Sequence, residues 1–247
     1  MTTMNEIIKQ LIERKSTRIF LDKKISQDDK NIILEATYSA PTAGNMQLYS
    51  IIEINNQDLK DKLAILCDNQ SFIAKADWVL VYCADYYKWF NAFNNEGLNP
   101  RPIQEGDLLL SMQDAIIAAQ NSVTAAYSLG IGSCYIGDIM ENAETIIDLL
   151  DIPEHVYPCC MLVFGYPDIE HIEKKKPKRV DSKYVLFENK YHRLNKQELE
   201  DMLKPRAGLN DYHTCMEKFC NFKHNSDFSK EMQRSAKVYI DSFINKK

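Results

Sequence analysis

Residues 105–129 read EGDLLLSMQDAIIAAQNSVTAAYSL, and they predict the longest helix of the chain. Their apolar side chains occupy most of the circumference, and Gly130 follows at a position where glycine commonly ends a helix. A helix with so wide an apolar surface has to be buried on several sides. We therefore expect a central helix that a second subunit could share. The alternative is a helix buried only within its own monomer.

Shorter elements are expected on both sides of this helix. Apolar periodicity and capping residues predict the helices, and short apolar runs between polar residues predict the strands. Because these elements do not follow a strict strand–helix–strand period, the sequence predicts the α+β class. The expected helices are 4–15 (capped by Thr2 or Thr3), 26–39, 58–67, 143–150, 196–204, 211–221 and 228–244; the expected strands are 49–54, 78–84, 134–136, 156–164 and 184–187; residues 205–210 are expected to be a linker.

The composition is that of an ordinary globular protein. The chain has 247 residues, of which 45% are hydrophobic and 26% charged, and this length suits one domain with a sizeable core. The formal net charge of −5 argues against a general nucleic-acid binder, since binding to phosphates requires a basic face. We expect no nucleic-acid partner.

Cysteine usage and the N-terminus indicate a cytoplasmic protein. The seven cysteines are scattered and form no CxxC pair, which favours reduced thiols over disulfides or a metal site. The N-terminal stretch MTTMNEIIKQLIERK carries charges throughout, unlike a signal peptide. The longest apolar runs are far shorter than the ~20 residues that cross a bilayer, so no membrane association is expected.

Two basic stretches are candidate anion sites. Arg14, Ser16 and Arg18 alternate in ERKSTR (13–18), so their side chains would project from one face of an extended segment. Paired guanidinium groups match the oxygens of a phosphate well. The second stretch is KKKPKR (174–179), which needs either solvent or an anionic ligand to offset its charge. A solvated basic helix end and a solvated loop are the respective alternatives.

A third candidate is the glycine-containing run GIGSCYIGD (130–138). Its spacing and its position after a helix do not fit a dinucleotide-binding fingerprint, which follows a strand. We interpret it as a turn whose glycines let backbone amides approach a flat ligand. An ordinary helix-to-strand connection is the alternative.

Familiar catalytic constellations are absent from the sequence. There is no GxSxG elbow, HExxH motif or Walker A loop, and the five histidines lack the spacing of metal ligands and are expected at the surface. Cys134 is expected to be a buried, inert thiol. We expect no catalytic side chain and no metal ligand, so an enzyme with this sequence would borrow its chemistry from a cofactor.

In their order along the chain, these segments resemble the flavin-dependent nitroreductase family, closest to its NAD(P)H–flavin oxidoreductase and oxygen-insensitive nitroreductase branch. The matching segments are RKSTRIF (14–20), APTAGNMQ (40–47), Gln70 before ADWVLVYCAD (76–85), AAYSLGIGSCYIGDI (125–139), LLDIPEHVYPCCMLVFGYP (149–167) and KPKRVDSKYVLFENKY (176–191). The resemblance implies an α+β nitroreductase-like fold, with a mostly antiparallel central sheet flanked by helices. It also implies one domain over 1–247, with an FMN-binding core at 1–191 and a helical C-terminal extension at 192–247.

The resemblance further implies a homodimer with FMN at the subunit interface, and it assigns residues to the cofactor. Arg14, Ser16 and Arg18 match the motif that holds the phosphate and ribityl chain. A second basic pair, Lys176 and Arg179, does the same, with Lys178 as a rival for Lys176 because one extra residue separates the pair. The segments expected against the isoalloxazine ring are Thr42, Gly44, Asn45, Gln70, Tyr135, Ile136, Gly137 and Asp138. The family commonly has a glycine where Asp138 stands, so this side chain could alter substrate access or flavin potential.

The implied reaction is a ping-pong transfer of hydride from NADPH or NADH, through bound FMN, to a small-molecule oxidant. Nitroaromatics, quinones and free flavin are the candidate acceptors, and Arg18 or Lys176 would stabilise anionic reduced flavin. The alternative from another class is a flavin-binding or redox-sensing protein with little turnover. Two further alternatives are a relative that fragments flavin or dehalogenates aromatics, and a basic-loop interaction protein without cofactor.

Overall fold

The computed structural model describes residues 4–208 and 210–245. These residues divide into two compact units: the first runs through Lys174 and resumes at Glu231, and the second is Lys175–Lys230. The expected single domain over 1–247, with its core at 1–191 and its extension at 192–247, stays a prediction.

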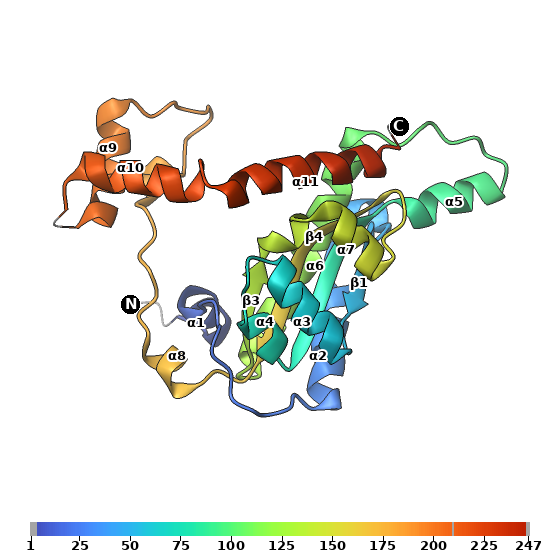
Figure 1. The fold of residues 1–247 in the computed structure, drawn as a ribbon, viewed down its shortest axis with the longest axis horizontal. Coiled ribbons are helices and arrows are strands. Elements are labelled where there is room, and N and C mark those ends of the chain that lie inside the picture. Colours follow the sequence, from blue (N-terminus) through green and yellow to red (C-terminus); the bar gives the residue numbers. More distant parts are fainter. Residues whose placement is uncertain (1–3, 209, 246–247) are drawn as a thin grey trace. The chain divides into compact units, whose positions relative to one another are not determined.

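A four-stranded antiparallel sheet forms the centre of the first unit. Its strands lie in the order β1-β2-β4-β3, so β1 and β3 are the two edges (Figure 1). The central pair, β2 and β4, is buried along its whole length. The strands are β1 (Tyr49–Glu53), β2 (Trp78–Asp85), β3 (Gly132–Ile136) and β4 (Val156–Gly165). Together with the helices around it, this sheet confirms the predicted α+β class.

Helix α6 (Glu105–Ser128) lies across the sheet and packs against all four strands and against α2 (Gln27–Tyr38). Its sheet-facing side is rich in small residues, which lets the helix axis come close to the strands. The fully buried side chains of α6 are Ser111, Ala115, Ala118, Ala119, Ser122, Val123 and Ala126. The helix ends as expected, with Gly130 at a φ of 74° directly after the C-cap residue Leu129.

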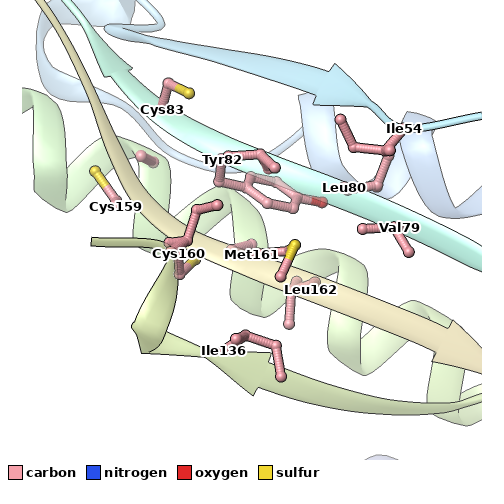
Figure 2. Close-up of a cluster of buried hydrophobic side chains, with 14 of the residues drawn as sticks. Ile54, Val79, Leu80, Tyr82, Cys83, Ile136, Cys159, Cys160, Met161 and Leu162 are labelled. Carbon is pink, nitrogen blue, oxygen red and sulfur yellow. The ribbon is translucent and has the colours of Figure 1, made fainter. Parts of the chain in front are cut away.

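The hydrophobic core joins the sheet to the helices that cover it. Side chains of the central strands pack on both faces of the sheet: Tyr82 on β2 points to one face, and Met161 on β4 and Ile136 on β3 point to the other (Figure 2). All three are buried. Burial of this apolar surface is the main driving force for the fold. A core on so small a sheet needs both of its faces covered, which the helices provide.

The remaining helices of the first unit begin at polar caps. Ser26 accepts a hydrogen bond from the backbone of Asp29 at 3.0 Å, as the sequence predicts for the start of α2. The first helix is capped by Asn5; Thr2 and Thr3, the expected caps, lie outside the described residues. The helices are α1 (Glu6–Glu13), α3 (Gln57–Leu66), α4 (Phe72–Lys75), α5 (Tyr87–Asn95), α7 (Ala143–Leu150), α8 (Ile169–Glu173) and, across the unit boundary, α11 (Asp227–Phe243); short 3₁₀ turns are η1 (Ala43–Asn45) and η2 (Gly137–Met140).

The second unit differs from the prediction in two places. Residues 184–187 were expected to form a strand, but a 3₁₀ turn, η3 (Ser182–Tyr184), stands there and Leu186 is 78% exposed. A strand needs a neighbour to pair with, and the described residues of this unit form only helices, turns and loops. The expected linker at 205–210 is helical at its start, because α9 (Lys196–Ala207) includes Pro205 in its last turn. Because proline has no N–H, the helical hydrogen bond from position 205 to the carbonyl of Asp201 is missing, and the helix ends soon after. Helix α10 (Tyr212–Lys223) follows.

Two helices of the first unit leave apolar side chains exposed. On α1, Ile7 is 63% exposed and Leu11 50% exposed. On α6, Leu109 is 60% exposed, and Ile116 and Ile117 are each 40% exposed. Helices α1 and α6 contact each other. The alternative in which the long helix is buried entirely within its own monomer is therefore wrong for this chain, because one side of α6 has no cover.

Candidate functional site

The segment that follows α1 runs along the start of β3. Ser16 forms a parallel bridge with Ser133, and the amide of Thr17 donates to the carbonyl of Ser133 at 2.8 Å. Thr17 is buried, and its hydroxyl lies 3.1 Å from Nε2 of His171, while Lys15 donates to the carbonyls of Ile172 and Lys174. Because Lys15 and Thr17 face the protein, the alternation predicted from the sequence leaves Arg14, Ser16 and Arg18 on the other side of this segment.

Two glycines that follow α6, Gly132 and Gly137, have different structural roles. A Cβ atom on Gly132 would come within 2.3 Å of Oγ1 of Thr17, so this glycine is required for the close approach of the Arg14–Arg18 segment to β3. Gly137 is exposed, and a Cβ built there meets nothing within 4 Å. The run 130–138 is thus largely strand β3 rather than the expected turn; of its glycines, Gly130 and Gly137 have open space beside them and Gly132 has none.

Arg14 carries an unsatisfied buried group. Its Nη1 atom is buried and has no hydrogen-bond partner within the described chain. Burial raises the pKa of the nearby Cys134 thiol, while Arg18, a hydrogen bond with Ser16, and Arg14 each act to lower it. All three predicted anion ligands therefore lie around Cys134 at the start of β3. An unpaired buried guanidinium nitrogen is costly, and an anion such as a phosphate would satisfy it.

Gln70 and Asp138 meet beside this cluster. Nε2 of Gln70 donates to Oδ2 of Asp138 at 2.5 Å and to the carbonyl of Cys67 at 2.8 Å. The guanidinium of Arg18 lies 5.9 Å from the ring centre of Phe72, at the start of α4. Gln70 and Asp138, which the resemblance assigns to the same ring, are thus in direct contact.

The loop that leads into β1 holds the other predicted ring contacts. Gly44 and Asn45 both have positive φ angles, 56° and 57°, in the turn η1. Asp114, which is 3% exposed, accepts hydrogen bonds from the backbone amides of Ala43 (2.9 Å) and Leu48 (3.1 Å). The carboxylate of Asp114 therefore fixes both ends of the Thr42–Gln47 loop onto α6.

These two groups of residues lie at opposite ends of the sheet. Tyr49, just after the loop, is opposite Ala84 on β2, and Ala84 is opposite Tyr157 at the start of β4. Ser133 on the other edge strand is opposite Phe164, near the end of β4. With about 3.3 Å per residue along a strand and about 4.8 Å between strands, Tyr49 and Ser133 are roughly 25 Å apart. Within one chain, the start of β1, which follows the Thr42–Gln47 loop, is thus far from the part of β3 beside the Arg14 cluster.

The second basic stretch lies in the second unit. Lys178 and Arg179 line a cavity of that unit together with Lys183 and Arg206. Lys176 also belongs to this unit. Both members of the predicted pair, Lys176 and Arg179, and the rival Lys178 are therefore in a part of the chain separate from Arg14 and Arg18, and their role toward a phosphate stays a prediction.

Sequence reasoning missed two residues of this site. Asp114 stands in the middle of a helix, where a polar residue is ordinarily a solvated one; its position among apolar neighbours is the signal that could have identified it. Glu141, three residues after Asp138, is only 6% exposed, although glutamate is rarely buried without a partner. The sequence contains no comparable signal for Glu141.

Other expectations about reactive side chains have mixed outcomes. Cys134 is buried, as predicted. The histidines are not all at the surface, because His155 and His171 are buried; Nδ1 of His155 lies 2.5 Å from the carbonyl of Phe243, and His171 bonds Thr17. Within the described residues, no group of three or more His, Cys, Asp or Glu side chains is arranged to hold a metal ion. No helix in the same residues is long and apolar enough to cross a membrane.

Comparisons with known proteins agree on one family. Residues 11–166 match the nitroreductase family. The chain is 27% identical to the FMN reductase (NADPH) of Bacillus subtilis (strain 168), over 99% of this chain and 98% of that protein. It is 32% identical to the oxygen-insensitive NADPH nitroreductase of Salmonella typhimurium, over 78% of each chain. The structure of NfrA2 from B. megaterium is similar with a TM-score of 0.82 and 26% identity, over 97% of this chain and 99% of that one.

Proposed function

Because the chain belongs to the nitroreductase family, we propose that it is an FMN-dependent NAD(P)H oxidoreductase. Its full-length relatives include an FMN reductase (NADPH) and an FMN reductase [NAD(P)H], both from B. subtilis. The observation that carries the proposal is the buried Nη1 of Arg14, which lacks a partner within the described chain. It lies in a cluster with Ser16 and Arg18 that suits a phosphate.

The residues fit FMN at both of its ends. Arg14, Ser16 and Arg18 would hold the phosphate and the ribityl chain, and charge-assisted hydrogen bonds of this kind contribute about 1.5–3 kcal/mol each. The resemblance also assigns Lys176 and Arg179 to the phosphate, and this role stays a prediction. The ring would lie along β3 beyond the cluster, over the backbone of Tyr135–Asp138 and near Gln70, where Gly137 leaves open space.

The site needs a second copy of the chain. The loop with Thr42, Gly44 and Asn45 leads into Tyr49, which is roughly 25 Å from Ser133 within one chain by the sheet spacings above, so a partner chain would bring the loop to the same ring. The exposed apolar side chains of α1 and α6 supply a surface for such a partner. A homodimer with FMN at the subunit interface accounts for both observations.

Bound FMN supplies a group that accepts a hydride and passes it on. The chain's own residues bind and orient this group, and Arg18 offers a positive charge near it. No described side chain is placed as a nucleophile. NADPH or NADH and then a nitroaromatic, quinone or free flavin would occupy the same open face in turn, which is a ping-pong cycle. A cytoplasmic location suits this chemistry and the reduced thiols.

The visible absorption spectrum of the purified protein tests the proposal. We expect a flavin spectrum that bleaches under anaerobic NADPH or NADH and recovers when a quinone is added. Protein that binds added FMN but does not bleach would instead be a flavin-binding protein without turnover. Colourless protein that ignores added FMN would overturn the proposal.

Mixing two defective variants tests the shared site. One variant carries Arg14→Ala and Arg18→Ala, the other Thr42→Ala and Asn45→Ala, and each alone should bind FMN poorly. If each site takes its arginines from one chain and its loop from the other, a mixed dimer contains one intact site. We expect mixing to restore up to one FMN per mixed dimer. No recovery in dimers shown to have exchanged subunits would contradict the shared site.

A further inference from the structure

Two carboxyl groups lie next to each other at the edge of the candidate site. The 3₁₀ turn η2 places Asp138 and Glu141 three residues apart, and the amide of Glu141 donates to the carbonyl of Asp138 at 3.0 Å. Their side chains are also hydrogen-bonded to each other. Two carboxylates cannot form a hydrogen bond unless one of them carries a proton.

Glu141 is the member that suits the proton. It is 6% exposed, and its Oε1 has no hydrogen-bond partner within the described chain. The charged groups that act most strongly on Glu141 are acidic: Asp138 from η2, Asp68 after α3, and Glu231 from α11, which itself pairs with Arg234. Burial, followed by these charges, raises the pKa of Glu141 to about 8. The Cys67 thiol nearby is also neutral, because burial raises its pKa.

Two acceptor oxygens of this cluster, one from Cys67 and one from Asp138, determine how the side-chain amide of Gln70 is oriented. Nε2 of Gln70 donates to the carbonyl of Cys67 and to Oδ2 of Asp138. Both partners are acceptors, so the NH₂ end of the amide has to point at them and both of its hydrogens are used. A rotation of the amide by 180° would place its oxygen against two other oxygens. Oε1 is therefore the only group that Gln70 has left for a ligand.

We propose that Asp138 and Glu141 share one proton, that this pair holds the Gln70 amide in a single orientation, and that Gln70 thereby selects a ligand group that donates an N–H. The proton stays on Glu141, and Asp138 accepts the hydrogen bond from Gln70. Asp138 and Glu141 are positioning residues here, because they act on the ligand only through Gln70.

The ligand half of this inference rests on the proposed function. The oxidised isoalloxazine ring has a single ring N–H, at N3, and carbonyl oxygens on both sides of it. An amide oxygen at Gln70 matches that N–H and would repel the carbonyl oxygens. The acidic residue at position 138 is thus a determinant of how the ring is recognised, rather than an obstacle to substrate.

The proton-sharing half is tested on the protein without flavin. We expect a carboxylic-acid C=O band in the infrared spectrum at pH 7 that is lost in Glu141→Gln. The side-chain NH₂ resonances of Gln70 in ¹⁵N NMR spectra should shift with an apparent pKa near 8 in the native protein. They should stay constant with pH in Glu141→Gln, which supplies an uncharged donor to Asp138. Glu154→Gln, at an exposed position, is the matched control and should leave both signals unchanged.

Several outcomes would overturn the shared proton. A native protein without the acid band, or Gln70 resonances that do not respond to pH between 6 and 10, would show that Glu141 is not the protonated member. If the Gln70 resonances of Asp138→Asn shift with pH as they do in the native protein, Asp138 does not hold Gln70. None of these measurements depends on whether the protein binds FMN.

The ligand half is tested with FMN and its N3-methyl derivative, which lacks the ring N–H. We expect the native protein to prefer FMN about tenfold, a ratio worth about 1.4 kcal/mol. The preference should fall to less than threefold in Asp138→Asn and in Gln70→Ala and persist in Glu154→Gln. An unchanged preference in the first two variants would overturn the role of Gln70. Failure of the native protein to bind FMN at all would overturn the proposed function and leave the shared proton standing.

Discussion

Two buried charges at opposite ends of the sheet illustrate two uses of a charged side chain. Asp114 on α6 accepts hydrogen bonds from two backbone amides, so its charge is satisfied within the chain and the Thr42–Gln47 loop is held in place. Arg14, beside β3, has a buried Nη1 without a partner in the described chain. The first arrangement is complete in one monomer, whereas the second leaves a polar atom unpaired.

The difference shows which half of the candidate site is preorganised. The loop is held at both ends by Asp114 but lies away from the arginines, so under the proposed function it reaches a ligand only across a dimer interface. The arginine end is close to β3, where the ring is proposed to lie, but contains an unsatisfied group. Changes at Asp114 should therefore affect stability, and changes at the arginine end should affect binding.

The largest effect is expected from separating the two chains of the proposed dimer, and with them the loop and the arginines of one site. Leu109→Glu places a charge on the exposed apolar side of α6, and burying an unpaired carboxylate in an interface costs several kcal/mol. We expect dimer affinity to fall by about 100-fold or more, together with a loss of FMN although Arg14 is intact. Sedimentation and flavin content measure the two effects. Ile65→Glu, at a 65% exposed position on α3, is the control. A monomeric variant that retains FMN would refute a site shared between chains.

The next effect concerns the arginine end. Removing both guanidinium groups with Arg14→Ala and Arg18→Ala should weaken FMN binding by about 100-fold to 10,000-fold, since each contributes about 1.5–3 kcal/mol. The apoprotein should not lose stability, because the unpaired buried nitrogen of Arg14 is removed as well. Fluorescence titration and thermal unfolding check these expectations. Lys62→Ala removes an exposed cation elsewhere and should change neither. Unaltered FMN affinity in the folded double variant would eliminate the arginine cluster as the phosphate site.

For Asp114, at the loop end, we expect the reverse: a loss of stability rather than a loss of FMN affinity. Asp114→Asn replaces one of two accepting oxygens with an NH₂ group that faces a backbone amide. We expect a loss of about 2–3 kcal/mol in the free energy of unfolding, since a buried donor is left unsatisfied. Denaturant unfolding of the apoprotein measures it, with Asp148→Asn at an exposed position as the control. A stability equal to that of the native protein would mean that Asp114 does not hold the loop.

The smallest effect is expected from the carboxyl pair. The pKa of Glu141 is raised from 4.5 to about 8 in the folded chain. Between these pH values the folded state holds a proton that the unfolded state releases, so stability falls as the pH rises through this window. Glu141→Gln removes the dependence, and its gain in stability should be about 2 kcal/mol larger at pH 8 than at pH 6. Denaturant unfolding at both pH values checks this, and an equal gain at both would contradict it.

Much of the fold could be predicted because it depends on local patterns. Several features can be recognised from a few neighbouring residues: the apolar run at 105–129, the buried strands at 78–84 and 156–164, and the Ser26 cap. The strand expected at 184–187 failed because a strand also requires a neighbour, which no local pattern supplies. The alternation of Arg14, Ser16 and Arg18 could also be predicted, because it too depends only on neighbouring residues.

The sequence by itself determined the class of fold, the family and the residue types that suit a phosphate, since periodicity, capping and motif order are properties of neighbouring residues. Only the tertiary structure decided that Gln70 meets Asp138, that Glu141 is buried among carboxylates and that the loop lies far from the arginines. Those facts depend on strand order and on burial, which bring together or keep apart residues that are distant along the chain. Burial also changes the chemistry of a side chain, as the raised pKa of Glu141 illustrates.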